Sequence, residues 1–329
     1  MAKLPVTIAC GPYDRMEAIR TGDVQIEGID PTYVAIQSPP EIFARMVKTV
    51  SFDVAEMSTA YYLIRRAQGD FPFIALPVFP SRLFRHGFVF INTNAGIAEP
   101  KDLAGKRIGV QEFRQTAAVW IRGLLRDELG VDLSGVHWLE GGVNVSRRPD
   151  TDFDLRPTKP INIETIPSGI TLSDMLASGE IDALLGARRP GSLGQHDNVA
   201  RLLPDYRARE REYYARTGIF PIMHTLVIRE DLHRSHPWAA ESLFKAFEAS
   251  KAWAAEQMRF SGAMRYMLPW LFDDLDEIDD LFGGDCWPYG LGPNRATLEA
   301  FVRYLVDDGF LDAPASLDNM FTPIVGWEE

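Results

Sequence analysis

The chain has 329 residues, of which 46% are hydrophobic, and this length favours two globular domains over one. Its net charge of -12 argues against non-specific binding to nucleic acid or to a membrane surface, because both need a basic face. Only Cys10 and Cys286 occur, far apart, so neither a disulfide framework nor a thiolate metal site is indicated. The sequence opens on a strand-like run without an apolar signal segment, and it contains no run of about 18 apolar residues. We therefore expect a cytoplasmic protein.

The first part of the chain alternates between strand-like and helix-like segments. Short apolar runs predict strands at 6–9, 32–36, 52–57 and 74–78. Helices are predicted at 15–21, after Pro39-Pro40 and after Ser58-Thr59, where proline, serine and threonine favour a helix start. Strands that alternate with helices are typical of parallel sheets with right-handed crossovers.

The same alternation restarts after residue 86. Strands are predicted at 87–92, 107–110, 161–166 and 181–185. Helices are predicted at 116–129 and 171–178, each followed by a glycine, and the polar segment 141–159 is predicted to be a loop or short hairpin. A strand at 219–229 returns the chain to the first domain, and the sequence after His236 is mostly helical. We expect a first lobe of residues 1–86 and 226–329 and a second lobe of residues 87–225.

Two motifs resemble the type 2 periplasmic-binding-protein fold. They are PKDLAGKRIGV at 100–110 and LSDMLASGEIDA at 172–183. The resemblance implies an α/β architecture of two lobes, each with a mixed sheet flanked by helices, joined by two crossing strands with the ligand cleft between the lobes. These motifs are shared widely, so they indicate a fold and not an activity.

Four further motifs are similar to the 4,5-dihydroxyphthalate decarboxylase family, and together they extend over nearly the whole chain. They are VFPSRLFRH at 78–86, QTAAVWIRG at 115–123, FPIMHT at 220–225 and WPYGLGPNR at 287–295. The resemblance implies a cytoplasmic carboxy-lyase of phthalate degradation, a branch of aromatic catabolism, which converts 4,5-dihydroxyphthalate to protocatechuate and CO2.

This chemistry requires a proton at the ring carbon that bears the carboxylate, while a para hydroxyl stabilises the dearomatised intermediate. No electron-sink cofactor is therefore expected. The second carboxylate offers a handle that suits the planar fork of arginine. Arg82 and Arg85 are the first candidates for this clamp, because they lie where the first crossing strand leaves its lobe, and Arg188 and Arg189 follow the strand at 181–185. Composition alone would make Arg82, Arg85 and His86 surface charges paired with this protein's many carboxylates, and one of Arg188 and Arg189 is expected to point away.

His86 and His224 are the histidines nearest the expected crossings, and either could carry the transferable proton. The sequence offers no basis for choosing between them, and either could instead be a structural hydrogen-bonding residue. Glu112 could accept a proton from a catechol hydroxyl. Gln115 and Thr116 open the helix at 116–129, where they could bind a substrate oxygen or simply cap the helix.

Residues after other strands complete the set of candidates. Asp14 and Arg15 follow the first strand, Ser58 follows the third, and Tyr289 enters on the resemblance alone. An ordinary helix cap is the alternative for Asp14. A Zn, Mn or Fe ion could compete for His86, His224, Glu112 and Asp14, but no HxH, HExxH or CxxC spacing supports one, so no metal site is assigned.

The sequence thus predicts an enzyme that clamps a small aromatic dicarboxylate with arginines and decarboxylates it by ring protonation. A non-catalytic solute-binding protein of the same fold is the alternative, and a biosynthetic enzyme acting on another aromatic or heterocyclic acid is a more distant one. Neither nucleic acid nor membrane is an expected partner, and a homo-oligomer is left open.

Overall fold

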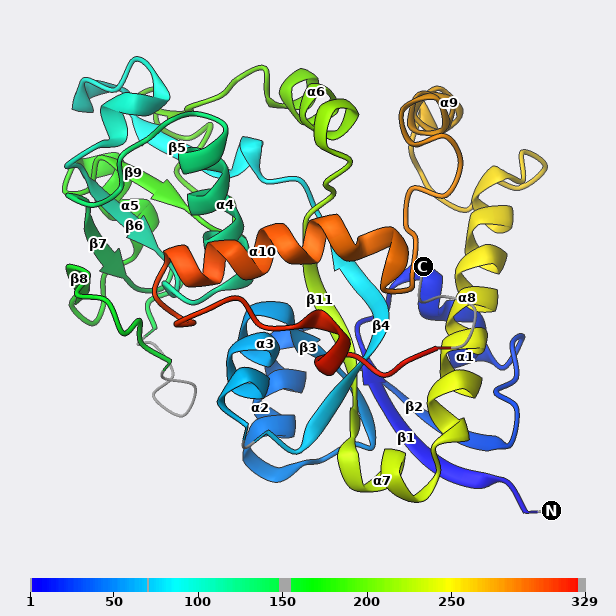
Figure 1. The fold of residues 1–329 in the computed structure, drawn as a ribbon. Coiled ribbons are helices and arrows are strands. Elements are labelled where there is room, and N and C mark those ends of the chain that lie inside the picture. The colour runs from blue at the N-terminus through cyan, green and yellow to red at the C-terminus, as the bar shows by residue number, and fades with distance from the viewer. Residues whose placement is uncertain (1, 70, 148–154, 325–329) are drawn as a thin grey trace. The chain divides into compact units, whose positions relative to one another are not determined.

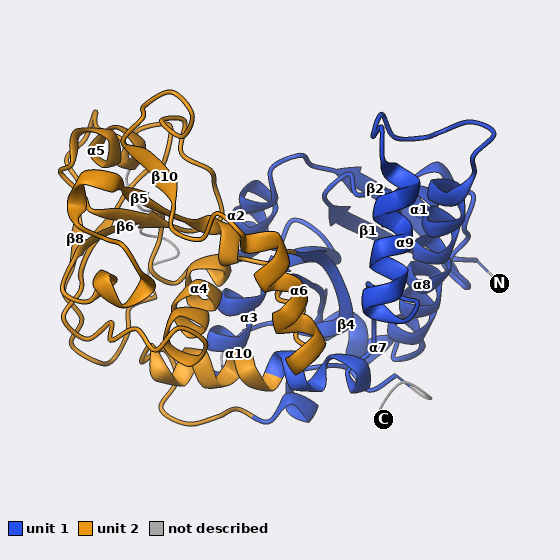
Figure 2. Ribbon diagram, turned by 90° about the horizontal axis from the view of Figure 1, so that it is seen from above, with its two compact units in different colours: residues 1–82, 224–298, 316–329 blue, residues 83–223, 299–315 orange. Residues whose placement is uncertain are grey.

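The computed structural model describes residues 2–69, 71–147 and 155–324 (Figure 1). The chain divides into two compact units, coloured separately in Figure 2. Unit 1 comprises residues 1–82, 224–298 and 316–329, and unit 2 comprises residues 83–223 and 299–315. None of the helices described here is long and apolar enough to cross a membrane.

This division differs from the expected one at three places. Residues 83–86 belong to unit 2, where the Leu83 amide donates to the Pro221 carbonyl at 3.1 Å, and residues 224–225 belong to unit 1. Residues 299–315 were expected in the first lobe but also lie in unit 2, because Phe301 stacks on Trp120 with ring centroids 5.0 Å apart.

Unit 1 is built on a five-stranded sheet in the order β2-β1-β3-β11-β4. Its strands are β1 (Leu4–Cys10), β2 (Ile29–Ala35), β3 (Val54–Ser58), β4 (Phe73–Arg82) and β11 (Ile222–Arg229). Strand β1 is parallel to β2 and to β3, whereas β11 is antiparallel to β3. The sheet is mixed and not purely parallel, because β11 enters it from a segment of unit 2 without a crossover helix of unit 1.

Unit 1 also contains several helices, some of which cover the faces of its sheet. They are α1 (Glu17–Thr21), α2 (Pro39–Thr49), α3 (Thr59–Gln68), α7 (Glu230–Ser235), α8 (Trp238–Arg259) and α9 (Leu271–Phe282). Figure 1 shows α2 and α3 on one face and α1 and α8 on the other. Short 3-10 turns are η1 (Asp14–Met16), η6 (Gly292–Asn294) and η7 (Leu317–Asn319).

Unit 2 contains a six-stranded mixed sheet in the order β10-β5-β9-β6-β7-β8. Its strands are β5 (Val89–Asn92), β6 (Arg107–Val110), β7 (His137–Glu140), β8 (Ile163–Thr165), β9 (Ala183–Leu185) and β10 (Val199–Arg201). Its helices are α4 (Thr116–Asp127), α5 (Leu172–Ser178), α6 (Tyr206–Thr217) and the second part of α10 (Arg295–Asp307), with 3-10 turns η2 (His86–Phe88), η3 (Thr93–Ala95) and η4 (Pro100–Leu103).

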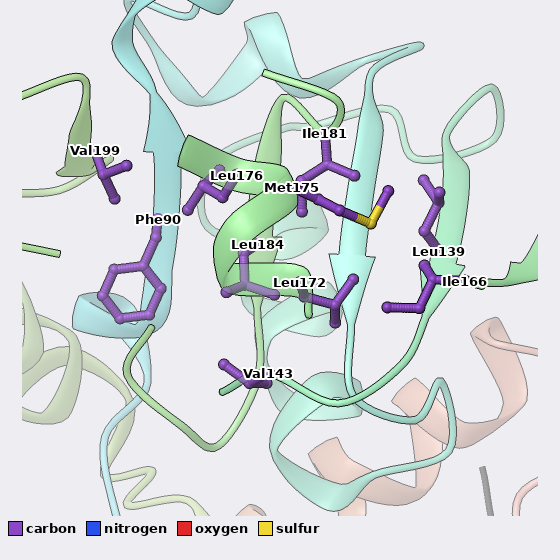
Figure 3. Close-up of a cluster of buried hydrophobic side chains, with 10 residues drawn as sticks. All are labelled: Phe90, Leu139, Val143, Ile166, Leu172, Met175, Leu176, Ile181, Leu184 and Val199. Atoms are coloured by element: carbon purple, nitrogen blue, oxygen red, sulfur yellow. The ribbon is translucent and has the colours of Figure 1, made fainter. Parts of the chain in front are cut away.

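Helix α5 supplies the core on one side of the unit 2 sheet. The Thr171 hydroxyl accepts a hydrogen bond from the Asp174 amide at the start of α5, and Gly179 ends the helix with a φ of 84°. Figure 3 shows the buried cluster, formed by Phe90, Leu139, Val143, Ile166, Leu172, Met175, Leu176, Ile181, Leu184 and Val199. Burial of each large aliphatic or aromatic side chain stabilises the fold by about 1.5–3 kcal/mol.

Several elements differ from the sequence predictions. Strands β7 and β10 and helix α6 were not predicted, and the segment expected as a strand at 87–92 begins with the η2 turn. The returning strand starts at Ile222 and not at Ile219. Part of the polar segment 141–159 lies outside the described residues.

Candidate active site

The middle residue of β3 in unit 1, Glu56, carries a carboxylate whose side chain is fully buried. Because β11 runs antiparallel to β3, His224 at the start of β11 pairs with Ser58 at the end of β3. Cross-strand pairing therefore brings the imidazole beside Glu56, and Nδ1 of His224 lies 2.6 Å from Oε1 of Glu56.

Three other groups donate hydrogen bonds to this carboxylate. The Tyr13 hydroxyl donates to Oε1 at 2.7 Å, and the Gly11 amide and the Cys10 thiol donate to Oε2 at 2.9 and 3.5 Å. Burial alone would raise the pKa of the Glu56 carboxyl. The hydrogen bond and charge of His224, with the hydrogen bonds from Tyr13 and Gly11, hold that pKa below its usual range. Glu56 is therefore a stable buried anion.

The phenol and the thiol in this group remain protonated. Burial, with the neighbouring Glu56 carboxylate, raises the pKa of both Tyr13 and Cys10. Both groups consequently act as hydrogen-bond donors to Glu56 at neutral pH.

His224 is the member of this group that can reach a ligand. Its side chain is 20% exposed, whereas that of Glu56 is 0% exposed. Glu56 engages Nδ1, so Nε2 on the other side of the ring is left for a substrate, and Phe43 packs against the imidazole with centroids 5.1 Å apart. A histidine oriented by a buried carboxylate is suited to proton transfer, because the carboxylate fixes the ring and stabilises its charged form.

Asp14 and Arg15 lie in the η1 turn after β1, and Ser58 is the last residue of β3. The Arg15 guanidinium donates from Nε to the Pro80 carbonyl at 2.7 Å and from Nη1 to Asp14 at 2.8 Å. It also lies 4.3 Å from the ring centroids of both Tyr13 and Trp287. Asp14 thus serves to orient Arg15.

The Ser58 hydroxyl accepts a hydrogen bond from the Tyr61 amide at 3.5 Å, so Ser58 is the N-cap residue of α3.

Arg82 and Tyr289 are buried in unit 1. Arg82 is 5% exposed, and its Nη2 donates to the Pro288 carbonyl at 2.8 Å and to the Asn294 side chain. These contacts are those of a residue that stabilises the fold. Tyr289 is 0% exposed, and its hydroxyl has no hydrogen-bond partner within the described part of the chain.

Arg85 and His86 lie in unit 2, at the η2 turn, and are 5% and 6% exposed. Burial lowers the pKa of Arg85 to about 10, although the charge of Glu210 opposes this. Burial and the charge of Arg209 lower the pKa of His86 to about 4, so this imidazole is neutral at physiological pH. His86 is consequently a poor proton donor at neutral pH.

The remaining candidates lie near α4 and β9 of unit 2. Glu112 forms ion pairs with Arg114, at 2.9 Å, and with Arg147. Gln115 accepts from the Ala187 amide at 3.2 Å and makes no side-chain cap on α4, so the capping alternative fails for this residue.

Thr116, the first residue of α4, is buried, whereas Arg188 and Arg189 after β9 are exposed.

Sequence reasoning missed the central residue of this site. Glu56 interrupts the apolar run of β3, and an acidic residue inside a buried strand signals a functional or fully satisfied carboxylate. Tyr13 and Glu210 were also missed. Within residues 2–69, 71–147 and 155–324, no three His, Cys, Asp or Glu side chains are grouped so that they could hold a metal ion.

Comparison with known proteins identifies relatives along most of the chain. A Comamonas testosteroni protein named 4,5-dihydroxyphthalate decarboxylase is 41% identical over 303 residues, which cover 92% of this chain and 91% of that protein. A Pseudomonas putida protein of the same name is 40% identical over 215 residues, which cover 65% of this chain and 83% of that protein. No protein-family model matches the chain.

Solved structures resemble this one in fold. A periplasmic sulfonate-binding protein, SsuA from Methylobacillus flagellatus KT, has a TM-score of 0.53 at 14% identity and covers 98% of this chain and 92% of its own. The ligand-binding component of an import system from Staphylococcus aureus has a TM-score of 0.53 at 11% identity, covering 98% and 97%. The expected periplasmic-binding-protein-like fold, with two mixed sheets flanked by helices, is confirmed.

Proposed function

The chain belongs to the 4,5-dihydroxyphthalate decarboxylase family, and we propose that it is a carboxy-lyase that converts 4,5-dihydroxyphthalate to protocatechuate and CO2. The observation that carries this proposal is the 41% identity to the Comamonas testosteroni relative across 91% of that protein. The substrate is a small aromatic dicarboxylate whose carboxylates each have a para hydroxyl.

His224 is the proposed general acid. Glu56 holds Nδ1 at 2.6 Å, so the proton that is transferred leaves from Nε2. Nε2–H protonates the ring carbon that bears the carboxylate, and the para hydroxyl stabilises the resulting cationic ring. The carbon–carboxylate bond then breaks, its electron pair restores the aromatic ring, and CO2 leaves. Solvent returns one proton to Nε2, so each turnover consumes one proton and releases one CO2.

The environment of His224 supports this role over His86. His224 is oriented by the Glu56 carboxylate and is 20% exposed, whereas His86 is buried, and burial with the charge of Arg209 lowers the pKa of His86 to about 4. An acid that is already deprotonated at neutral pH cannot supply the proton. The para hydroxyl already stabilises the intermediate, so this chemistry demands no electron-sink cofactor.

The proposal is tested by mixing the purified protein with 4,5-dihydroxyphthalate and measuring CO2 release and the ultraviolet spectrum of protocatechuate. We expect equal amounts of both products. His224→Gln should lower kcat by about 10²- to 10⁴-fold, the usual contribution of a positioned proton donor. His196→Gln is the matched control, because His196 is exposed.

Two results would contradict this reading in different ways. Tight binding of the substrate by the native protein without CO2 release would indicate a solute-binding protein. Normal turnover by His224→Gln would keep the activity and remove His224 from the mechanism.

A further inference from the structure

We propose that unit 2 contains a carboxylate-binding site anchored by Arg85, and that binding there is accompanied by uptake of a proton at Glu210. The inference rests on the proposed function only in its choice of probe, an aromatic carboxylate. Its evidence is the set of contacts around the η2 turn.

The first observation is that Arg85 is a buried cation with poor partners. Its Nε donates to the thioether sulfur of Met223 at 3.3 Å, and sulfur is a weak acceptor. Its Nη1 is buried and has no hydrogen-bond partner among the residues described. Arg82, which is equally buried at 5% exposure, donates instead to the Pro288 carbonyl and to Asn294. Among the described residues Arg85 therefore has a sulfur acceptor but no oxygen acceptor, and the carboxylate of a ligand would supply the missing one.

The second observation is that polar groups beside Arg85 are also incompletely satisfied. Nδ1 of His86 is buried without a hydrogen-bond partner in the described chain, and its closest carboxylate oxygen, Oε1 of Glu210, lies 3.8 Å away. Two adjacent residues therefore present unused polar atoms within one small region. A carboxylate, with two oxygens and several lone pairs, can accept from both an arginine and a neutral histidine.

The chemistry of the surroundings favours an aromatic carboxylate. The ring of Phe88 lies 4.8 Å from the Arg85 guanidinium carbon, and Met223 adds an unbranched apolar side chain. Because Nη1 is closed to solvent without a ligand, a side chain must move to admit one. Met223 suits this because its side chain is flexible and its hydrogen bond to Arg85 is weak.

Glu210 gives the site its dependence on protons, because its Oε1 accepts from the Gly87 amide at 3.4 Å and lies 3.8 Å from Nδ1 of His86. Burial raises the pKa of Glu210 to about 7, although the amides of Gly87 and His86 and the charges of Arg201 and Arg85 oppose this rise. Arg209, on the same helix, is a further nearby cation and acts on His86. A second carboxylate next to Arg85 disfavours the ionised form of Glu210, so binding draws a proton onto Glu210.

The first test measures binding of phthalate, which lacks the hydroxyl groups needed for decarboxylation, by titration calorimetry. Between about pH 7 and pH 9 phthalate stays ionised, and the affinity of the native protein should fall by up to about tenfold for each pH unit. Buffers of different ionisation enthalpy should reveal uptake of about one proton at pH 8. Glu210→Gln should bind phthalate with an affinity that does not change over this range.

The second test compares two equally buried arginines by the same substitution. Arg85→Met should weaken phthalate binding by at least about tenfold, without lowering the unfolding temperature, because it removes a buried guanidinium that has no oxygen acceptor among the described residues. Arg82→Met should lower the unfolding temperature, because it leaves the Asn294 side chain and the Pro288 carbonyl without this donor. Arg85→Lys keeps the charge but loses the fork and should also bind phthalate weakly.

Several outcomes would overturn the inference. The proposed binding role of Arg85 is wrong if the native protein does not bind phthalate or if Arg85→Met binds it normally. It is also wrong if the unfolding temperature of Arg85→Met is as low as that of Arg82→Met. The proton uptake is wrong if Glu210→Gln keeps the native pH dependence. Binding of phthalate is scored without turnover, so failure of the decarboxylase activity would be seen separately.

Discussion

At the scale of single residues, Glu56 determines what His224 can do. Glu56 touches His224 and is itself inaccessible, since its side chain is 0% exposed. It therefore acts through the imidazole and is a positioning residue. Tyr13, Gly11 and Cys10 hold the carboxylate from its other sides, so Glu56 cannot turn away from His224 without losing several hydrogen bonds.

Glu56→Gln separates positioning from substrate binding. The amide is nearly isosteric but carries no charge, so it no longer stabilises the imidazolium of His224. We expect kcat to fall by on the order of 10²-fold or more, with KM little changed, because Glu56 does not contact the substrate. Steady-state kinetics on 4,5-dihydroxyphthalate measure both constants.

Tyr13→Phe is the companion variant. It removes one hydrogen bond from Oε1 of Glu56 but leaves the contact with His224, so a smaller loss of kcat is expected. If Glu56→Gln raised KM and left kcat intact, the positioning role would be wrong.

The site was only partly predictable from sequence, and the reasons lie in particular residues. His224 was proposed because it lies near an expected crossing, and Arg15 because it follows the first strand. Glu56 was missed because it lies within the strand β3, where side-chain polarity alone does not reveal which face it occupies. The burial of His86 is what favours His224 in our proposal, and the sequence around His86 contains no sign of that burial or of Arg209, more than 100 residues later, nearby.

At the scale of secondary-structure elements, α4 is attached to the end of α10 by a buried ion pair. Arg122 donates from Nη2 to Oδ2 of Asp308 at 2.6 Å, and both side chains are 1% exposed. Arg126 contacts the other oxygen at 2.7 Å. The guanidinium of Arg122 also lies 3.7 Å from the ring centroid of Phe113.

Asp308→Asn should therefore be strongly destabilising. It leaves the charge of Arg122 buried without its counterion, which costs about 3–5 kcal/mol of unfolding free energy. Asp127→Asn is the control, because the pair of Asp127 with Arg303 is 35% and 56% exposed, and loss of such a pair costs about 0–1 kcal/mol. Urea unfolding measures both changes, and equal values would show that burial does not strengthen the Asp308 pair.

The elements themselves were predictable to different degrees. Helix α4 carries regular apolar spacing and ends near Gly130, so its position was clear from sequence. Helix α6 was missed because its sequence YRAREREYYART has charges on all sides and lacks an apolar stripe. Strand β10 has only three residues, too few for a pattern to identify.

At the scale of the whole molecule, both units are discontinuous in sequence. Unit 2 draws residues 299–315 from beyond the return of the chain to unit 1. These residues supply Phe301 and Tyr304, whose rings pack on Trp120 with centroids 5.0 and 5.6 Å away. Sequence could not assign them to unit 2, because a helical stripe does not specify which partner it packs against.

A polypeptide of residues 83–223 alone should accordingly fold poorly. It lacks the aromatic partners of Trp120 and the counterion of Arg122. The same polypeptide joined to residues 299–315 by a flexible glycine and serine linker should recover a cooperative thermal transition and near-ultraviolet circular dichroism. Cooperative melting of the shorter polypeptide would show that residues 299–315 are dispensable for unit 2.

The position of β11 has a consequence for synthesis on the ribosome. In the sheet of unit 1, β11 lies between β3 and β4, yet it is translated only after residues 83–221 have been made. At a translation rate of about 5–20 residues per second, the inner edges of β3 and β4 lack their partner strand for on the order of ten seconds. Unpaired apolar strand edges invite association with other chains. The nascent protein therefore passes through a period in which binding by a chaperone protects the four strands of the sheet that already exist.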